Sequence, residues 1–132
     1  MKGITYNLEK LIASGNFDTG VIERFYYDKQ EYFDALTDFR YDYKRDLTNY
    51  TPAFVINSKE DSEEFMKECF EIRAIFIKLG FTAVLETLVR LEDAAISHSE
   101  KAFSDAQIRF RATLKICKDE LQAAANRWKI TR

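Results

Sequence analysis

The sequence predicts an all-α fold: an antiparallel up-down four-helix bundle with short extra N-terminal helices. Apolar residues recur at alternating three- and four-residue steps through several long segments, which is the spacing that gives a helix one buried face. Only four glycines and one proline interrupt the 132 residues, and the links between the last three segments are short, which favours antiparallel neighbours. We expect an N-terminal segment over residues 1–16 and one helical bundle domain over residues 17–127.

The first two helices are expected to be short. Gly15 suits the left-handed C-cap of the first helix, and Asp18 is a candidate N-cap for the second. The first helix carries Ile4, Leu8, Leu11 and Ile12 on one face, and the second contains Val21, Ile22 and Phe25.

The first long helix is expected over residues 28–47. Asp28 and Glu31 form a start that is similar to a capping box. Its continuous apolar stripe consists of Tyr32, Leu36, Phe39, Tyr43 and Leu47. After this helix, Thr51 and Pro52 are compatible with a short helix that has proline at its first position, or with a loop that contains one helical turn.

Three further long helices complete the predicted bundle. The second begins at Asp61, which pairs with Glu64 as a cap, and it ends at Gly80. The third follows at once and ends near residues 97–99, and Ser104 is a candidate N-cap for the fourth. The expected inward residues are Phe65, Cys69, Ile72, Phe76 and Leu79 in the second helix, Val84, Leu88, Leu91 and Ala95 in the third, and Phe110, Leu114, Cys117, Leu121, Ala124 and Trp128 in the fourth.

Charge and composition argue against several classes of partner. Twenty basic and twenty-two acidic side chains give a formal net charge of -2, so no basic surface for nucleic acid or anionic lipid is expected. No apolar run reaches the length of a signal peptide or a membrane span, and we expect a cytoplasmic protein. Cys69 and Cys117 lie in apolar stripes and are interpreted as buried core residues.

The sequence also lacks the patterns of common catalytic and cofactor sites. It has no Glu-x-x-His pair for a bundle metal site, no glycine-rich phosphate loop, no nucleophile elbow and no Cys-x-x-Cys motif. We therefore expect no metal, no cofactor and no enzymatic activity.

A series of short stretches runs in order along the predicted helices. They are Phe17-Asp18, Ile22-Glu23-Arg24-Phe25, Asp28, Tyr32-Phe33-Asp34-Ala35-Leu36-Thr37-Asp38-Phe39, Asp61, Leu79-Gly80 and Leu91-Glu92-Asp93-Ala94-Ala95. Through them the chain resembles the histidine-containing phosphotransfer (HPt) domains of bacterial phosphorelays, over about residues 17 to 125. The resemblance implies a four-helix bundle whose second long helix carries the phosphoacceptor histidine.

The position of that histidine is occupied by Phe70. In the family the histidine is followed by a hydrophobe at +2, a lysine at +3, a glycine at +4 and a hydrophobe-glycine pair at +9 and +10. Counting back from Leu79-Gly80, the matching residues here are Phe70, Ile72, Arg73 and Ala74. Phosphotransfer needs an imidazole nitrogen as nucleophile, and a phenyl ring has no lone pair to supply. The chain is thus identified as a degenerate member that keeps the scaffold and a positive charge at +3 but lacks the reactive atom.

A helical wheel supports a second apolar surface on the same helix. At about 100° per residue, one flank away from the inward stripe collects Met66, Phe70, Arg73, Ala74 and Ile77. Such a flank is either a binding surface or core covered by another segment. Residues 1–15 or the Phe54-Val55-Ile56 stretch are the candidates to cover it.

Three functions remain open from the sequence. In the first, the Phe70 flank docks a response-regulator receiver domain, or a related two-component protein such as a sensor kinase, without carrying phosphate. In the second, the same flank closes a homodimer of a structural or assembly module. In the third, the chain is an active phosphorelay transfer protein that uses another residue. The only histidine, His98, is a weak candidate because it is expected in an exposed turn without flanking basic groups.

Overall fold

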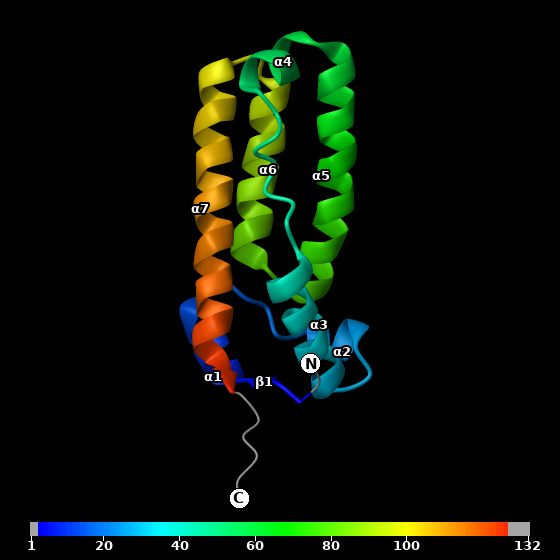
Figure 1. The fold of residues 1–132 in the computed structure, drawn as a ribbon, viewed down its shortest axis with the longest axis vertical. Helices are drawn as coiled ribbons and strands as arrows, with labels where there is room; N and C mark the ends of the chain where they lie inside the picture. Colours follow the sequence, from blue (N-terminus) through cyan, green and yellow to red (C-terminus); the bar gives the residue numbers. More distant parts are fainter. Residues whose placement is uncertain (1–2, 127–132) are drawn as a thin grey trace, which may run out of the picture.

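The protein is mostly helical, as its sequence predicts. The structure is a computed structural model that describes residues 3–126 (Figure 1). Its elements are β1 (Thr5–Tyr6), α1 (Leu8–Ser14), α2 (Val21–Phe25), α3 (Lys29–Asp42), α4 (Pro52–Asn57), α5 (Lys59–Leu79), α6 (Thr82–Ile96), α7 (Glu100–Ala124) and β2 (Ala125–Asn126).

Three long helices, α5, α6 and α7, stand side by side and form the body of the molecule (Figure 1). Gly80 ends α5 in the left-handed conformation with a φ of 75°, and a short turn through His98, with a φ of 62°, joins α6 to α7. All the stripe residues predicted for these helices are buried, apart from Trp128, which lies outside the described residues. The prediction of their inward faces is therefore confirmed.

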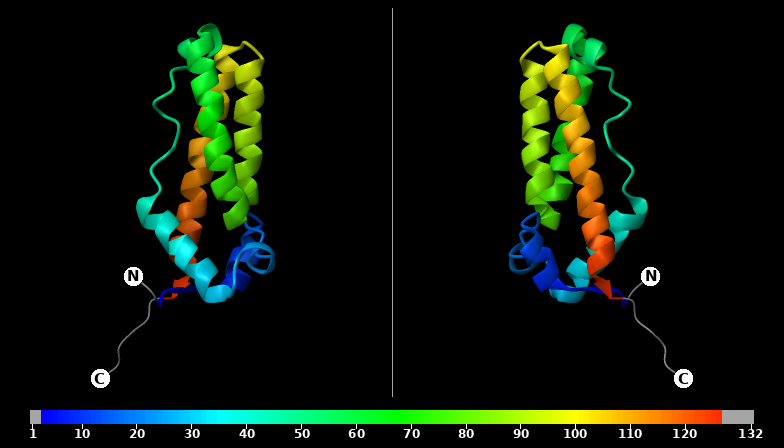
Figure 2. Two further views of the ribbon diagram at one scale, coloured as in Figure 1. Left: turned by 90° about the vertical axis from the view of Figure 1, so that its right-hand side faces the viewer. Right: turned by 90° about the vertical axis from the view of Figure 1, so that its left-hand side faces the viewer.

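The first long helix is shorter than expected. It ends at Asp42 rather than Leu47, and the chain then continues as residues 43–51, here called the strap, which runs along the bundle (Figures 1 and 2). Tyr43 and Leu47 are still buried, with 7% and 1% of their surface exposed, because an extended segment can also turn residues four apart toward the core. Residues 28–47, predicted to form one long helix, are thus divided between α3 and the strap.

Side chains from the neighbouring helices hold the strap. The Lys118 ammonium donates to the carbonyl oxygen of Tyr43 at 3.1 Å, and the Gln107 amide donates to the carbonyl oxygens of Leu47 at 2.7 Å and Tyr50 at 2.9 Å. Arg45 forms ion pairs with two glutamates of α5. In a continued helix, the carbonyl oxygens of the strap would accept N–H groups from the next turn. Here side chains of α7 donate to them instead, which explains how α3 can end at Asp42.

Several helix starts differ from the predicted ones. α5 begins at Lys59 with Ser58 as its cap, and α7 begins at Glu100 with Ser99 as its cap, one turn before the predicted Ser104. Each cap is a hydroxyl that accepts a backbone N–H three residues on, at 3.3 Å for Ser58 and 3.1 Å for Ser99. Ser99 directly follows His98, whose left-handed conformation ends the preceding turn, so α7 begins there and Ser104 lies inside the helix.

The short elements give mixed outcomes. The cap predicted at Asp18 is wrong: α2 has Gly20 at its N-cap, and the Asp18 carboxylate instead accepts the Gly20 N–H at 2.9 Å. Ile12, predicted on the inward face of α1, is 55% exposed, whereas Leu11 is buried. Thr51 and Pro52 start the short helix α4, which was one of the two readings of that stretch.

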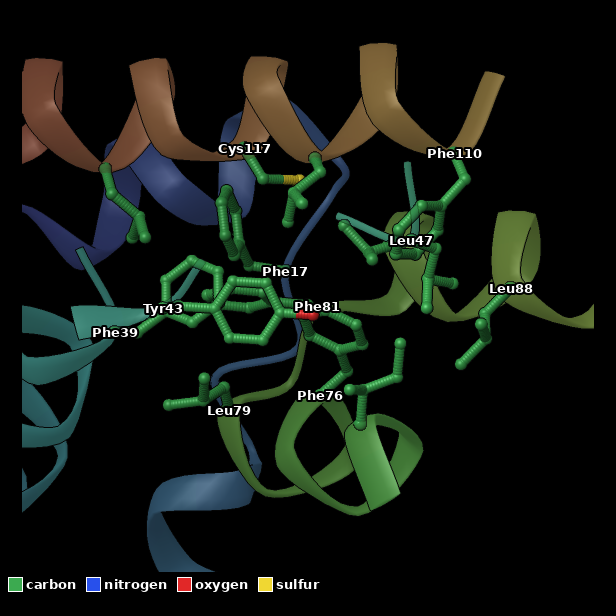
Figure 3. Close-up of a cluster of buried hydrophobic side chains, with 14 of the residues drawn as sticks. Phe17, Phe39, Tyr43, Leu47, Phe76, Leu79, Phe81, Leu88, Phe110 and Cys117 are labelled. Carbon is green, nitrogen blue, oxygen red and sulfur yellow. The ribbon is translucent and has the colours of Figure 1, made fainter. Parts of the chain in front are cut away.

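The N-terminal segment is part of the same core as the bundle. β1 pairs with β2 in an antiparallel ladder that joins Thr5 to Asn126, and the buried Tyr6 hydroxyl lies 2.9 Å from the hydroxyl of Thr37 on α3. Side chains from α3, α5, α6 and α7 meet in one hydrophobic cluster, rich in aromatic rings, at the centre of the molecule (Figure 3). Phe39 and Phe81 pack edge to face there, with ring centroids 4.8 Å apart.

Gly80 is held where a larger residue would not fit. The Asp18 N–H donates to the Gly80 carbonyl at 2.7 Å, so the backbone before α2 lies directly against the end of α5. A Cβ added to Gly80 would lie 2.2 Å from the Asp18 carbonyl oxygen. The turn between α5 and α6 therefore needs glycine for its positive φ and for this close approach.

Candidate functional site

The outer flank of α5 is open to solvent. Phe70, the residue that the sequence predicts at the phosphoacceptor position, is 71% exposed. α1 packs against α7, and α4 packs beside the N-terminal half of α5 and against α7, so neither candidate cover reaches the ring. The alternative in which Phe70 is covered core is wrong for the described residues.

The other four predicted site residues differ in exposure. Ala74 is exposed and Ile77 is 43% exposed, so they extend the open surface around Phe70. Met66 is only partly accessible because its side chain packs on the edge of the core. Arg73 lies between this flank and α6, with about a third of its side chain exposed.

Arg73 does not project freely into solvent. Its guanidinium donates to the carboxylate of Glu92 on α6, and Glu92 is a buried acidic residue. A carboxylate in that position needs a paired cation, since an isolated buried charge is costly. The positive charge that the sequence predicted for the docking flank is thus neutralised by a partner on the next helix.

The ion pair also fixes how α6 contributes to the surface. Because Glu92 faces α5, residues three before and four after it lie on the same side of α6. Those residues are Val89 and Ile96, which are 49% and 64% exposed. We name the combined surface the α5–α6 face: Met66, Phe70, Ala74, Ile77, Val89 and Ile96.

Sequence reasoning missed the α6 half of this face. Val89 and Ile96 were not in the inward stripe, and their apolar character outside it was a usable signal. Whether these two residues lie beside α5 depends on the Arg73–Glu92 pair. That pair joins residues 19 positions apart, so it can be identified only once the two helices are placed against each other.

The α5–α6 face is suited to contact rather than to chemistry. Its side chains are aromatic, aliphatic or thioether groups, and none supplies a titratable nucleophile. Large exposed apolar side chains gathered over two helices lose unfavourable contact with water when a partner covers them. The surface is therefore a candidate protein interface.

The histidine and the two cysteines of the chain lie outside the α5–α6 face. His98 is exposed in the α6–α7 turn, as predicted. Cys69 and Cys117 are buried free thiols, and burial raises the pKa of each to about 12, so almost none is thiolate near neutral pH. Residues 3–126 hold no cluster of His, Cys, Asp and Glu suited to a metal ion.

None of the described helices combines the length and the apolar character needed to cross a bilayer. Comparisons of the chain with protein-family models, with curated proteins and with solved structures gave no match.

Proposed function

We propose that the protein is an HPt-like signalling module that docks a response-regulator receiver domain, or a related two-component protein, without carrying phosphate. In this proposal α3, α5, α6 and α7 correspond to the four helices of an up-down HPt bundle, with α3 shortened, and the location is cytoplasmic. The observation that carries it is Phe70, an exposed aromatic ring on the second long helix at the place of the phosphoacceptor.

The composition of the α5–α6 face supports docking. Aromatic side chains often dominate interface energies, and Phe70 has apolar neighbours within one or two turns on both helices. Ala74, one turn after Phe70, has a small side chain that allows a partner to come close to the helix backbone. The proposal therefore assigns Phe70 as the anchor and the surrounding aliphatic residues as the groups that exclude water.

Phosphate transfer has little support at this site. The phenyl ring has no nucleophilic nitrogen, and Glu92 already neutralises Arg73, the residue expected to offset phosphate charge. We expect no acid-labile phosphate on the protein after incubation with acetyl phosphate, or with a kinase and a phosphorylated receiver. Stoichiometric phosphohistidine at His98 would favour the transfer function instead.

The direct test is capture of partners from native lysate and titration of the captured receiver domain. The protein is compared with Phe70→Asp and with a matched control, Ile108→Asp, which adds the same charge at an apolar residue of α7 that is 62% exposed. Phe70→Asp should lower affinity by about 30-fold or more, whereas Ile108→Asp should leave it within about twofold. Equal binding by all three proteins would contradict the proposal.

A homodimer is the second candidate because the exposed apolar residues extend over two helices. Light scattering after size exclusion separates the two functions. A dimer that Phe70→Asp converts to a monomer would assign the α5–α6 face to a second copy of the chain. A monomer that binds a receiver domain would support the first function.

A further inference from the structure

A concave surface lies on the other side of α5, between this helix and α3. It is an open groove of about 580 Å³. Phe39 and Tyr43 contribute to its lining from α3 and the strap, and Ile75 and Leu79 contribute from α5. None of these residues belongs to the α5–α6 face, so the groove is separate from the proposed docking surface.

The groove follows from the early end of α3. Figure 2 shows that α3 is inclined to the three long helices, and the strap then leaves α3 in a new direction. Two helices that diverge cannot interdigitate their side chains along their whole length, so a wedge between them stays unfilled. Its volume falls within the range of about 300–1,000 Å³ that is typical of small-molecule sites.

Charged residues of both signs surround this apolar floor. Asp38 and Asp42, one turn apart, line it from α3, while Lys78 lines it from α5 and Lys44 from the strap. Within residues 3–126, none of these four side chains makes an ion pair or a side-chain hydrogen bond. Arg45 also lines the groove, but its guanidinium is already paired with Glu68 and Glu71.

This arrangement matches one class of ligand better than others. An apolar floor favours a ligand with an aromatic or large aliphatic body. Two free carboxylates and two free ammonium groups favour a ligand that carries one charge of each sign, because a purely anionic or cationic ligand would also face like charges. We propose that the groove between α3 and α5 binds a small zwitterion with an apolar side chain, such as an aromatic amino acid or a short peptide.

The test uses three probes with the same indole body: tryptophan as the zwitterion, N-acetyltryptophan as the anion and tryptophanamide as the cation. Binding to the full chain is followed by chemical shifts of backbone amides at pH 7. We expect tryptophan to bind in the millimolar range or tighter, with shifts at Phe39, Tyr43, Ile75 and Leu79. Its affinity should exceed that of each singly charged probe by about fivefold.

Two charge-removing variants sharpen the result. Asp38→Asn with Asp42→Asn should weaken tryptophan binding by about fivefold and leave N-acetyltryptophan binding unchanged or stronger. Lys44→Gln with Lys78→Gln should also weaken tryptophan binding by about fivefold. This variant should leave the binding of the cation tryptophanamide unchanged or stronger. All four residues are exposed, so both variants should keep the wild-type melting temperature.

Three outcomes would overturn the proposal. One is the absence of shifts in the groove for every probe, and another is equal affinity for all three probes, which would mean apolar adhesion without charge recognition. The third is shifts confined to the α5–α6 face. Phe70→Asp serves as the control, because it should weaken partner docking by about 30-fold or more while leaving tryptophan binding unchanged. Failure of one proposal is thereby distinguished from failure of the other.

Discussion

Phe70 and Phe76 are the same residue type on the same helix, under two turns apart, yet they have opposite environments. Phe76 is fully buried, with its ring 5.5 Å from the ring of Tyr43 and 6.0 Å from that of Phe81. Phe70 is 71% exposed and has no ring partner among the described residues. The difference shows that the inward face of α5 stabilises the fold, whereas its outer flank carries an apolar surface that the fold does not use.

The largest expected effect concerns the buried ring. Phe76→Ala should lower the free energy of unfolding by about 3–5 kcal/mol, because the neighbouring rings cannot fully close the cavity. Urea denaturation followed by circular dichroism measures this change. A loss below about 1 kcal/mol would mean that the inward face of α5 is misassigned.

A second prediction tests how the helix that carries both rings ends. Gly80→Ala should destabilise the protein by about 2–4 kcal/mol, from the strained positive φ and from contact between the new Cβ and the Asp18 carbonyl. Gly15→Ala is the matched control: its φ is also positive, but nothing lies within 4 Å of the added Cβ. The control should lose only about 1 kcal/mol, and equal losses would show that the close approach has no effect.

A third prediction concerns the ion pair at the boundary between the two environments. Arg73→Leu should destabilise by about 1–3 kcal/mol because it leaves the buried Glu92 carboxylate without its cation. Glu92→Leu should cost less, since the more exposed Arg73 can reach water. Adding Glu92→Leu to Arg73→Leu should restore much of the lost stability, as measured in a double-mutant cycle. Additive losses would argue against the pair.

The smallest effect on stability is expected for the exposed ring. Phe70→Ala should change the free energy of unfolding by less than about 0.5 kcal/mol, while partner binding or dimerisation falls by about 30-fold. Melting curves and binding titrations of the same preparation check both parts. A large loss of stability with unchanged binding would remove the distinction between the two phenylalanines.

Much of the fold was predictable because long helices repeat their pattern. The stripes of α5, α6 and α7 give many independent matches to a helical period, and Gly80 marks the end of α5. The end of α3 was not predictable in the same way. Tyr43 and Leu47 continue the helical spacing but are buried from an extended strap, which is held by Lys118 and Gln107 far along the chain.

The candidate surface was predictable only in part. The wheel of α5 placed Phe70 on an outer flank, but whether another segment covered it depended on where α1 and α4 pack. The pairing of Arg73 with Glu92 depends on the register of two helices, which no local pattern specifies. The groove beside α3 was missed because it results from an angle between helices.

The two-residue ladder between β1 and β2 brings the two ends of the described chain side by side. Thr5 and Asn126 are cross-strand partners, so a linker of a few residues can connect the two ends of the fold. The exposed turn at His98 lies at the opposite end of the bundle and offers a place for new ends (Figure 1). A circular permutant opened there should keep every helix intact. For the same reason, the whole domain can be inserted into a surface loop of a host protein with both junctions at one pole.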